Sequence, residues 1–295
     1  MVDAIGAAGG IGADKDAVGA QAYLDALAPI LARVSRQADG PVRDAADLLV
    51  ASLRAGGVVQ AFGTGHSEAL AMELAGRAGG LVPTNRICLR DLVVFGGEPP
   101  DVLGDGHLER DPSIAHRLYD LARPSPTDIF VIGSNSGVNG SVVELAQLAK
   151  NRGHRLVAVT SFTQTAAVDS RHPSGGKLID HADVALDNGA PYGDAALPLP
   201  GGGAVCAVSS ITSALLAHLV VAEVVRRLLE AGEEPPVYRS ANVPGGDEHN
   251  SVLEDRYAGR IRRTARPPEP QAAGPRWAAT NRRRRRGPPR PRRRR

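Results

Sequence analysis

The apolar positions of this chain fall into two alternating patterns. Some runs are short, unbroken and rich in β-branched residues, which is typical of strands buried in a parallel sheet. Between them, apolar residues recur every three or four positions, which predicts amphipathic helices. The predicted strands are Val58–Phe62, Leu81–Leu89, Asp128–Gly133, Arg155–Thr160 and Val184–Leu186. The predicted helices are Tyr23–Arg36, Val42–Ala55, Ser67–Arg77, Pro112–Ala122, Asn139–Lys150 and Ala204–Ala231.

This alternation predicts the fold. Strands that alternate with helices form a parallel sheet with right-handed crossovers and helices on both faces. We therefore expect an α/β fold, a three-layer αβα sandwich around a five-stranded parallel sheet. The Gly- and Pro-rich segments 90–111 and 187–203 are expected to be loops, and residues 235–263 to wrap back over the domain.

The segment after the strand Asp128–Gly133 carries the most specific polar pattern. Ser134, Asn135, Ser136 and Gly137 combine small polar side chains with a flexible glycine, and a helix follows. Such a junction makes an anion site, because free amides and the positive end of the helix dipole face the same point. The glycine and lysine spacing of a P-loop is absent. An ordinary strand–helix connection remains the alternative.

Two other predicted strands end in the same kind of loop. Val58–Phe62 is followed by Gly63-Thr64-Gly65-His66-Ser67, whose glycines allow close approach of a ligand and whose serine is a natural helix N-cap. Arg155–Thr160 is followed by Ser161. Ligands of parallel α/β sheets bind beyond the carboxyl ends of the strands. Convergence of the three loops therefore favours a phosphate site over structural turns.

Composition and cysteine content indicate what kind of protein this is and where it is expected to be located. Hydrophobic residues make up 42% of the 295 residues, which suits a globular core. No apolar run approaches the roughly 18 residues of a membrane span. Cys88 and Cys206 do not form a disulfide framework or a thiolate metal cluster. The acidic start of the chain lacks the features of a secretory signal, so we expect a cytoplasmic protein with no membrane contact.

Charge divides the chain into segments. Residues 264–295 contain twelve Arg and one Glu, a net charge of +11, so the other residues carry −8. This Pro/Arg-rich segment has no apolar periodicity, and we expect a disordered tail. Residues 1–18 are expected to be frayed and residues 19–263 to form a single domain. Arginine runs can neutralise nucleic-acid phosphates, but the domain offers no basic face, so nucleic acid is not an expected partner.

The two best-defined loops resemble those of SIS (sugar isomerase) domains. FGTGHS resembles the first SIS loop, and IGSNSGVNGSVVELAQLAKNRGHRLVAVTS resembles the second, with Asn139 where the family usually has Thr. The similarity covers about residues 20–232. The segments GAPYGDA and YRSANVPGGDEHNSVLEDRYAGRI resemble a less characterised subgroup, related to phosphoheptose isomerases and N-acetylmuramic acid 6-phosphate etherases.

This resemblance implies a flavodoxin-like sheet, a sugar-phosphate ligand and a homodimer with sites at the subunit interface. It also implies that Ser67, Ser134, Asn135 and Ser136 hold the phosphate. Gly65, Asn139 and Ser161 complete the expected set of binding residues. No cofactor is expected, and no metal, because no set of His, Glu or Cys has ligand spacing.

SIS enzymes act at C2 of a sugar phosphate, which requires a base and an acid. Glu73 is the first candidate for the base, because it lies seven residues after His66 on the same helix face, among alanines and leucines. His66 is expected to orient the sugar or to pass a proton. Glu109 lies in the region where the etherases place a second carboxylate, and His249, in the polar segment 245–250, is expected to close over a site. A salt-bridged helical Glu and a polar surface turn are the structural alternatives.

We therefore expect an enzyme that removes the C2 proton of a 6-phosphorylated (N-acetyl)hexosamine and expels the C3 substituent, as a dehydratase or an etherase-type lyase. Return of the proton at C1 would instead give an aldose–ketose isomerase. A non-catalytic sugar-phosphate sensor is the third hypothesis. Residues 1–57 are too short and wrongly patterned for the helix-turn-helix domain that usually accompanies such sensors.

Overall fold

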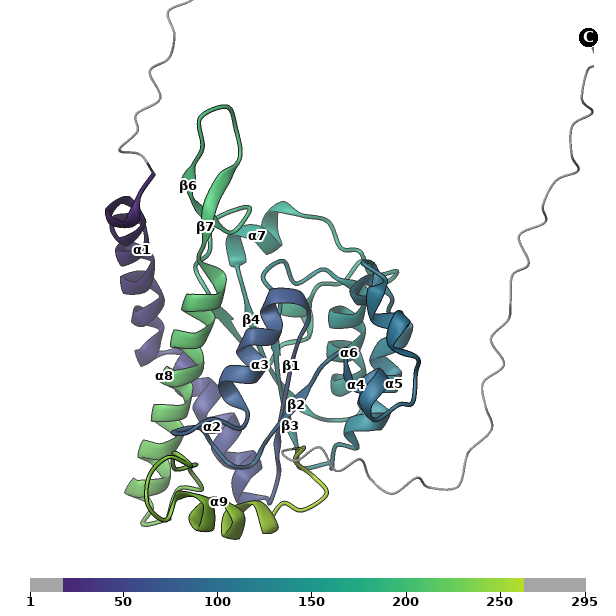
Figure 1. The fold of residues 1–295 in the computed structure, drawn as a ribbon, viewed down its shortest axis with the longest axis vertical. Coiled ribbons are helices and arrows are strands. Elements are labelled where there is room, and N and C mark those ends of the chain that lie inside the picture. Colours follow the sequence, from purple (N-terminus) through teal and green to yellow (C-terminus); the bar gives the residue numbers. More distant parts are fainter. Residues whose placement is uncertain (1–17, 263–295) are drawn as a thin grey trace, which may run out of the picture. The chain divides into compact units, whose positions relative to one another are not determined.

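A five-stranded parallel sheet in the order β2-β1-β3-β4-β5 forms the centre of the domain (Figure 1). The computed structural model describes residues 18–262, so the predicted tail and all but one of the residues predicted to be frayed lie outside the described part. The strands are β1 (Val59–Gly63), β2 (Thr84–Ile87), β3 (Ile129–Gly133), β4 (Arg155–Thr160) and β5 (Val184–Asp187). This strand order is the flavodoxin-like one. The predicted fold class is confirmed.

Alternating burial of the strands explains the three layers. In β3, Ile129 and Val131 pack into one core, and Phe130 and Ile132 pack into the other. The first core is covered by α2 (Pro41–Arg54), α3 (Glu68–Leu74) and α8 (Ser209–Glu230), with α1 (Ala20–Ser35) alongside. The second core is covered by α4 (Asp91–Val94), α5 (Ser113–Ala122) and α6 (Gly140–Asn151). Both faces of the sheet are therefore dry, as the continuous apolar runs predicted.

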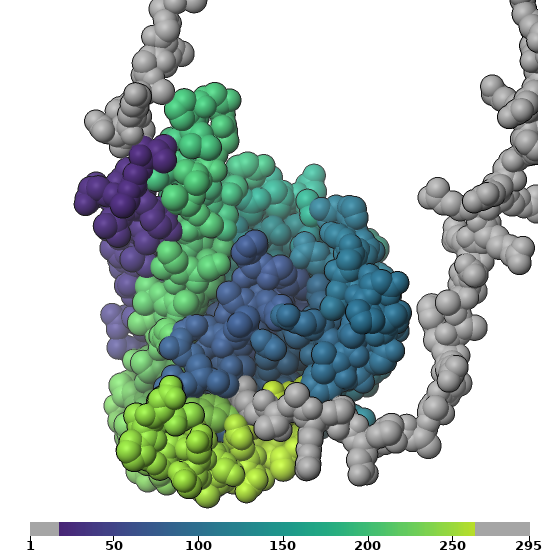
Figure 2. Space-filling view, in the orientation of Figure 1, coloured from purple at the N-terminus to yellow at the C-terminus, as the bar shows by residue number. Residues whose placement is uncertain are grey.

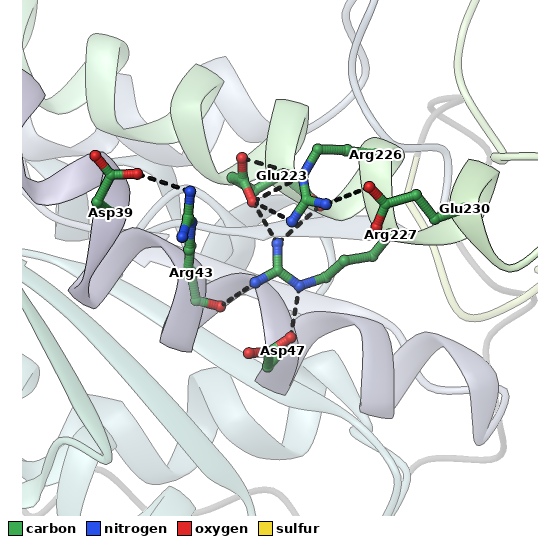
Figure 3. Close-up of polar contacts among 7 residues, drawn as sticks. All are labelled: Asp39, Arg43, Asp47, Glu223, Arg226, Arg227 and Glu230. Carbon is green, nitrogen blue, oxygen red and sulfur yellow. Dashed lines mark hydrogen bonds and ion pairs between the residues drawn. The ribbon is translucent and has the colours of Figure 1, made fainter.

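Helices α2 and α8 are also joined by a polar network centred on Arg227 (Figure 3). The Arg227 guanidinium donates to Asp47 on α2 and to Glu223 on its own helix, at 2.5 Å each, and to the Arg43 carbonyl at 3.1 Å. The Asp47 side chain is 64% exposed, so solvent screens this ion pair and it contributes little to stability. Its effect is to fix how the two helices are aligned, while the apolar contacts beneath it supply the packing energy.

The structure differs from the predicted elements most clearly after residue 187. Instead of a long loop and a helix from Ala204, the chain forms an antiparallel hairpin of β6 (Ala195–Pro198) and β7 (Ala204–Ala207), which projects at the top of Figures 1 and 2. Helix α8 begins only at Ser209. The apolar run 204–208 is compatible with either a buried helix or a strand, and the backbone pairing of the hairpin decides between them.

Smaller elements were also missed. Helices α7 (Phe162–Ala167) and α9 (Gly246–Asp255) lie in segments predicted to be irregular, and the helix predicted to reach Arg77 ends at Leu74. Short 3-10 turns lie at Arg36–Asp39, Gly65–Ser67, Pro100–Gly104, Leu108–Arg110 and Leu178–His181. Among residues 18–262, no helix combines the length and the apolar character needed to cross a bilayer.

Residues 235–262 cross the amino-terminal edge of the sheet. Val237 pairs with Leu81 just before β2, and the Arg260 guanidinium donates to the Gly56 carbonyl at 2.6 Å and to the Asp128 carboxylate, just before β1 and β3. This segment, yellow-green in Figures 1 and 2, therefore covers the end of the sheet opposite the strand carboxyl ends.

Asp183 gives the fold a measurable dependence on pH. Its carboxylate accepts hydrogen bonds from Lys150, Arg155 and the Leu156 N–H, and these outweigh burial and hold the pKa of Asp183 below its usual value. Such a carboxyl group stabilises the fold above its unfolded-state pKa of about 3.9 and loses that contribution as the pH falls toward the folded-state value.

We therefore expect Asp183→Asn to lower the free energy of unfolding by about 1–2 kcal/mol at pH 7, with a smaller loss at about pH 3.5. Urea unfolding at the two pH values measures both. Asp101→Asn, at an exposed side chain, is the matched control and should change neither. An equal loss from Asp183→Asn at both pH values would show that its charge does not stabilise the fold.

Candidate functional site

A cavity of about 380 Å³ opens at the carboxyl ends of β1 and β3. This volume lies within the range of about 300–1,000 Å³ that is usual for small-molecule sites. Eight of the predicted site residues line it: Gly65, His66, Ser67, Glu109, Ser134, Asn135, Ser136 and Asn139. The remaining lining residues are Thr64, Gln164, Gly193, Asp194 and Ser209. The sequence pattern and the cavity therefore indicate the same candidate ligand site, at the carboxyl ends of β1 and β3.

The loop between β1 and α3 folds tightly against its own helix. A Cβ on Gly63 would lie 2.2 Å from the Ser67 carbonyl oxygen, so only glycine permits this approach. The Ser67 N–H donates to the Thr64 carbonyl at 3.1 Å, which closes the turn. Within residues 18–262, the Ser67 hydroxyl and the His66 ring make no hydrogen bond. Both side chains are therefore available to a ligand.

The loop between β3 and α6 is held rigidly but keeps free donors. Ser134 Oγ accepts the Gly137 N–H at 3.1 Å, and Asn135 Oδ1 accepts from Asn188 Nδ2 at 3.0 Å. In the described part of the chain, neither the N–H nor the hydroxyl of Ser136 has a protein partner. The twelve-residue helix α6 begins a few residues later. Free amides, hydroxyls and the positive end of a helix dipole together suit an anion.

Thr160 and Ser161, at the third strand end, lie behind this loop and not in the cavity. Both are fully buried. The Ser161 N–H donates to the Asn135 carbonyl at 3.1 Å, and the Ser161 hydroxyl donates to the Ala190 carbonyl at 2.7 Å. Ser161 Oγ also accepts the Gln164 N–H and so caps α7. The structure therefore places Ser161 as a support for the loop that carries Ser134 to Ser136.

Glu109 lines the cavity, and among residues 18–262 only one of its two carboxylate oxygens has a protein partner. Its Oε1 accepts from Asn139 Nδ2 at 2.9 Å, and its backbone carbonyl accepts from the Ser141 hydroxyl at 2.7 Å. A Cβ on Gly140 would lie 2.1 Å from the Arg110 carbonyl oxygen, so glycine at this position lets α6 approach the turn that carries Glu109. Glu109 Oε2 points across the cavity, 3.6 Å from where a Cβ on Gly65 would lie. This oxygen therefore faces the space that a ligand in the cavity would occupy.

The structure places Glu73, the first predicted base, outside the cavity lining. Its carboxylate forms an ion pair with Arg77 and lies 2.6 Å from His218 Nε2, between α3 and α8. Burial, together with the charge of Arg77, lowers the pKa of His218. Arg77 and His218 therefore occupy the Glu73 carboxylate, whose side chain is only 25% exposed.

His249 lies on α9, where His249 Nε2 is 3.0 Å from the Val237 carbonyl oxygen. Val237 pairs with Leu81 at the amino-terminal edge of the sheet, so His249 lies at the opposite end of the domain from the cavity. Within this chain it does not join the other predicted site residues.

Asp194 and Ser209 line the cavity but were not predicted. The Asp194 carboxylate accepts the Ser209 N–H at 2.7 Å and the Ser209 hydroxyl at 2.6 Å, which caps the start of α8. Asp194 has a φ of 66°, in the left-handed region that is strained for most residues other than glycine. The Ser209-Ser210 pair is a helix-start signal, and α8 does begin there, whereas the predicted helix Ala204–Ala231 includes both serines in its interior.

The lining contains little charge. Its ionisable side chains within residues 18–262 are Glu109, Asp194 and His66, with no Lys or Arg. An anion would therefore be held by neutral donors. In that same part of the chain, no group of three or more His, Cys, Asp or Glu side chains is arranged to hold a metal ion.

A family model for the SIS domain matches residues 22–161, which include both loops of the cavity. A UPF0309 protein of Listeria monocytogenes is 43% identical over 221 residues, which are 75% of this chain and 89% of that protein. A UPF0309 protein of Streptomyces coelicolor is 37% identical over 240 residues, 81% of this chain and 95% of that protein. Among solved structures, a phosphoheptose isomerase from Francisella tularensis has a TM-score of 0.48 at 16% identity, over 69% of this chain and 95% of that chain.

The fold, the two loops and the matching domain model define a SIS domain, as the loop sequences predicted. The chain belongs to the UPF0309 family.

Ser136→Ala should weaken binding of inorganic phosphate by about 1.5–3 kcal/mol, because it removes a donor that has no other partner and that would bond a charged oxygen. Isothermal titration calorimetry measures the change. Ser113→Ala, at an exposed serine on α5, is the matched control and should leave the affinity unchanged. Equal affinities for wild type and Ser136→Ala would remove this loop from the phosphate site.

Proposed function

We propose that the cavity binds a 6-phosphorylated (N-acetyl)hexosamine. The phosphate is assigned to the hydroxyls of Ser67, Ser134 and Ser136 and to the Ser136 amide, near the start of α6. The free donors of these residues support this assignment. Charge-assisted hydrogen bonds from neutral groups to phosphate are strong in such a site.

The reaction we propose begins with the open-chain sugar, whose C1 carbonyl makes the C2 proton acidic. Glu109 Oε2 takes this proton, and the electrons of the C2–H bond are delocalised onto the carbonyl oxygen. They then form a C2–C3 double bond as the C3–O bond breaks, and His66 supplies the proton for the departing oxygen. Base and acid catalysis of this kind needs groups within hydrogen-bond reach of the reacting atoms. The free Oε2 of Glu109 inside the cavity is the observation that carries the proposal.

An aldose–ketose isomerase is the second candidate. Glu109 has one free carboxylate oxygen, and a single such group can move the proton from C2 to C1 without an acid at C3. The two reactions share the first step and differ only in the fate of the electrons.

We also propose that the chain acts as a homodimer. Met72 on α3 and Ile211 on α8 are 52% and 42% exposed, and these two helices pack against each other. A partner subunit over this face would cover apolar surface close to the Glu73–His218 pair.

Glu109→Gln should lower the rate of C2 proton exchange by about 10²–10⁴-fold, because the amide keeps its bond from Asn139 but cannot take a proton. The rate is read by proton NMR of N-acetylglucosamine 6-phosphate in deuterated water, with affinity followed by calorimetry. Glu73→Gln is the paired variant, and it should retain exchange.

If Glu73→Gln abolishes exchange and Glu109→Gln does not, the base is Glu73. If the wild-type protein binds the sugar phosphate but shows no exchange with any hexose or hexosamine phosphate, the domain is a sensor.

A further inference from the structure

We infer that Arg171 is a positioning residue, which sets the orientation of the Asn139 amide and, through it, of the Glu109 carboxylate. The role of Arg171 in catalysis rests on the proposed function of Glu109. The hydrogen bonds from which we infer that role do not depend on that function. Arg171 is exposed and does not line the cavity, so it acts through Asn139 and not on the ligand.

The three side chains form a directional relay. Arg171 Nη1 donates to Asn139 Oδ1 at 3.2 Å, and Asn139 Nδ2 donates to Glu109 Oε1 at 2.9 Å. A guanidinium has only donors and a carboxylate has only acceptors. The amide between them therefore satisfies both neighbours in one orientation, and the opposite orientation would place two donors together and two acceptors together. The relay leaves Glu109 Oε2 as the free oxygen.

The segment that carries Arg171 is fixed on both sides. The Arg171 N–H donates to the Val138 carbonyl at 3.0 Å, next to Asn139. His172 Nε2 lies 2.7 Å from Glu144 Oε2 on α6, and its side chain is only 6% exposed. His172 Nδ1 accepts the Ser174 N–H at 3.2 Å, so in the neutral ring Nε2 carries the proton and donates to Glu144. Arg171 is thereby held at a constant distance from the start of α6.

Asn139 occupies the position where the resembling motif usually has Thr. A threonine hydroxyl accepts and donates through a single oxygen atom, whereas the amide accepts through its oxygen and donates through its nitrogen, so the amide spans a wider gap between Arg171 and Glu109. Loss of Arg171 would leave Asn139 Oδ1 without its donor, so the amide would no longer be anchored and would hold the Glu109 carboxylate less firmly. The carboxylate would then shift away from the C2 proton, and small displacements of a catalytic group lower rates strongly.

Arg171→Met should lower the C2 exchange rate of N-acetylglucosamine 6-phosphate by about 10- to 100-fold, with the affinity for this probe within about twofold of wild type. Arg171→Lys, which keeps a donor, should lose less. The matched control is Arg155→Met, which removes the same charge at the other end of the sheet, where Arg155 pairs with Asp183. It should leave exchange and affinity unchanged.

A second readout does not depend on activity. In protein labelled with ¹⁵N-asparagine, the Asn139 side-chain signal is assigned by its loss in Asn139→Asp. The Nδ2 proton that bonds Glu109 Oε1 should exchange slowly with water in wild type and in Arg155→Met. It should exchange about tenfold or more faster in Arg171→Met, because the unanchored amide then breaks its bond to Glu109 more often.

An unchanged Asn139 signal in Arg171→Met overturns the relay, as does an equal loss of affinity and exchange, which would make Arg171 a direct ligand. If wild type shows no C2 proton exchange, the proposed function fails, and the Asn139 signal alone then tests the relay. Faster amide proton exchange in Arg171→Met would support the relay, and an unchanged amide signal would contradict it.

Discussion

The parallel pairing of β1 with β3 is the constraint on which the site depends. The two strands pair along their full length, with Val59 opposite Ile129 and Gly63 opposite Gly133. Both therefore end at the same level, and the loops that follow them leave the sheet side by side. The cavity forms between these loops, because the chain turns from each strand into a helix without filling the space above the sheet. The lining residues Thr64 to Ser67, Ser134 to Ser136 and Asn139 are positioned by these two strand ends.

The loops are rigid because buried polar groups behind them are satisfied. The Asn135 carbonyl accepts from both the Ser161 N–H and the Thr160 hydroxyl, and the Ser134 N–H donates to the Val159 carbonyl. These bonds lie in a dry region, where an unpaired group would cost about 1–3 kcal/mol. Within residues 18–262, the hydroxyls of Ser67 and Ser136 and the Ser136 N–H line the cavity without a protein partner. The loop is thus ordered before a ligand arrives, and binding costs less conformational entropy.

The sequence predicted the sheet and most of the cavity, since both follow from local pattern and one general rule. Apolar runs identified the strands, and polar loops after two of them, joined by Glu109, identified eight lining residues. The sequence did not predict the position of a residue where packing between distant parts of the chain determines it. Ser161 supports the loop that carries Ser134 to Ser136 and does not face the cavity. This position depends on contacts with residues far away in the sequence, which residue spacing does not predict.

Glu73 and the hairpin illustrate the same limit. Helical spacing relative to His66 placed Glu73 on the expected face, but its contacts with Arg77 and His218 arise from the packing of α3 against α8. The hairpin after β5 is built from short apolar runs that are compatible with a helix or a strand, so only the pairing between the strands distinguishes the two structures. Asp194, at its base, reaches the cavity for the same reason.

The central claim is that the free donors of the two loops bind the phosphate of a sugar phosphate. Calorimetric titration of the full-length protein with N-acetylglucosamine 6-phosphate and with N-acetylglucosamine tests it most directly. The account predicts an affinity at least about 100-fold higher for the phosphorylated sugar, because two or more charge-assisted hydrogen bonds depend on the phosphate. Equal affinities for the two sugars would contradict it.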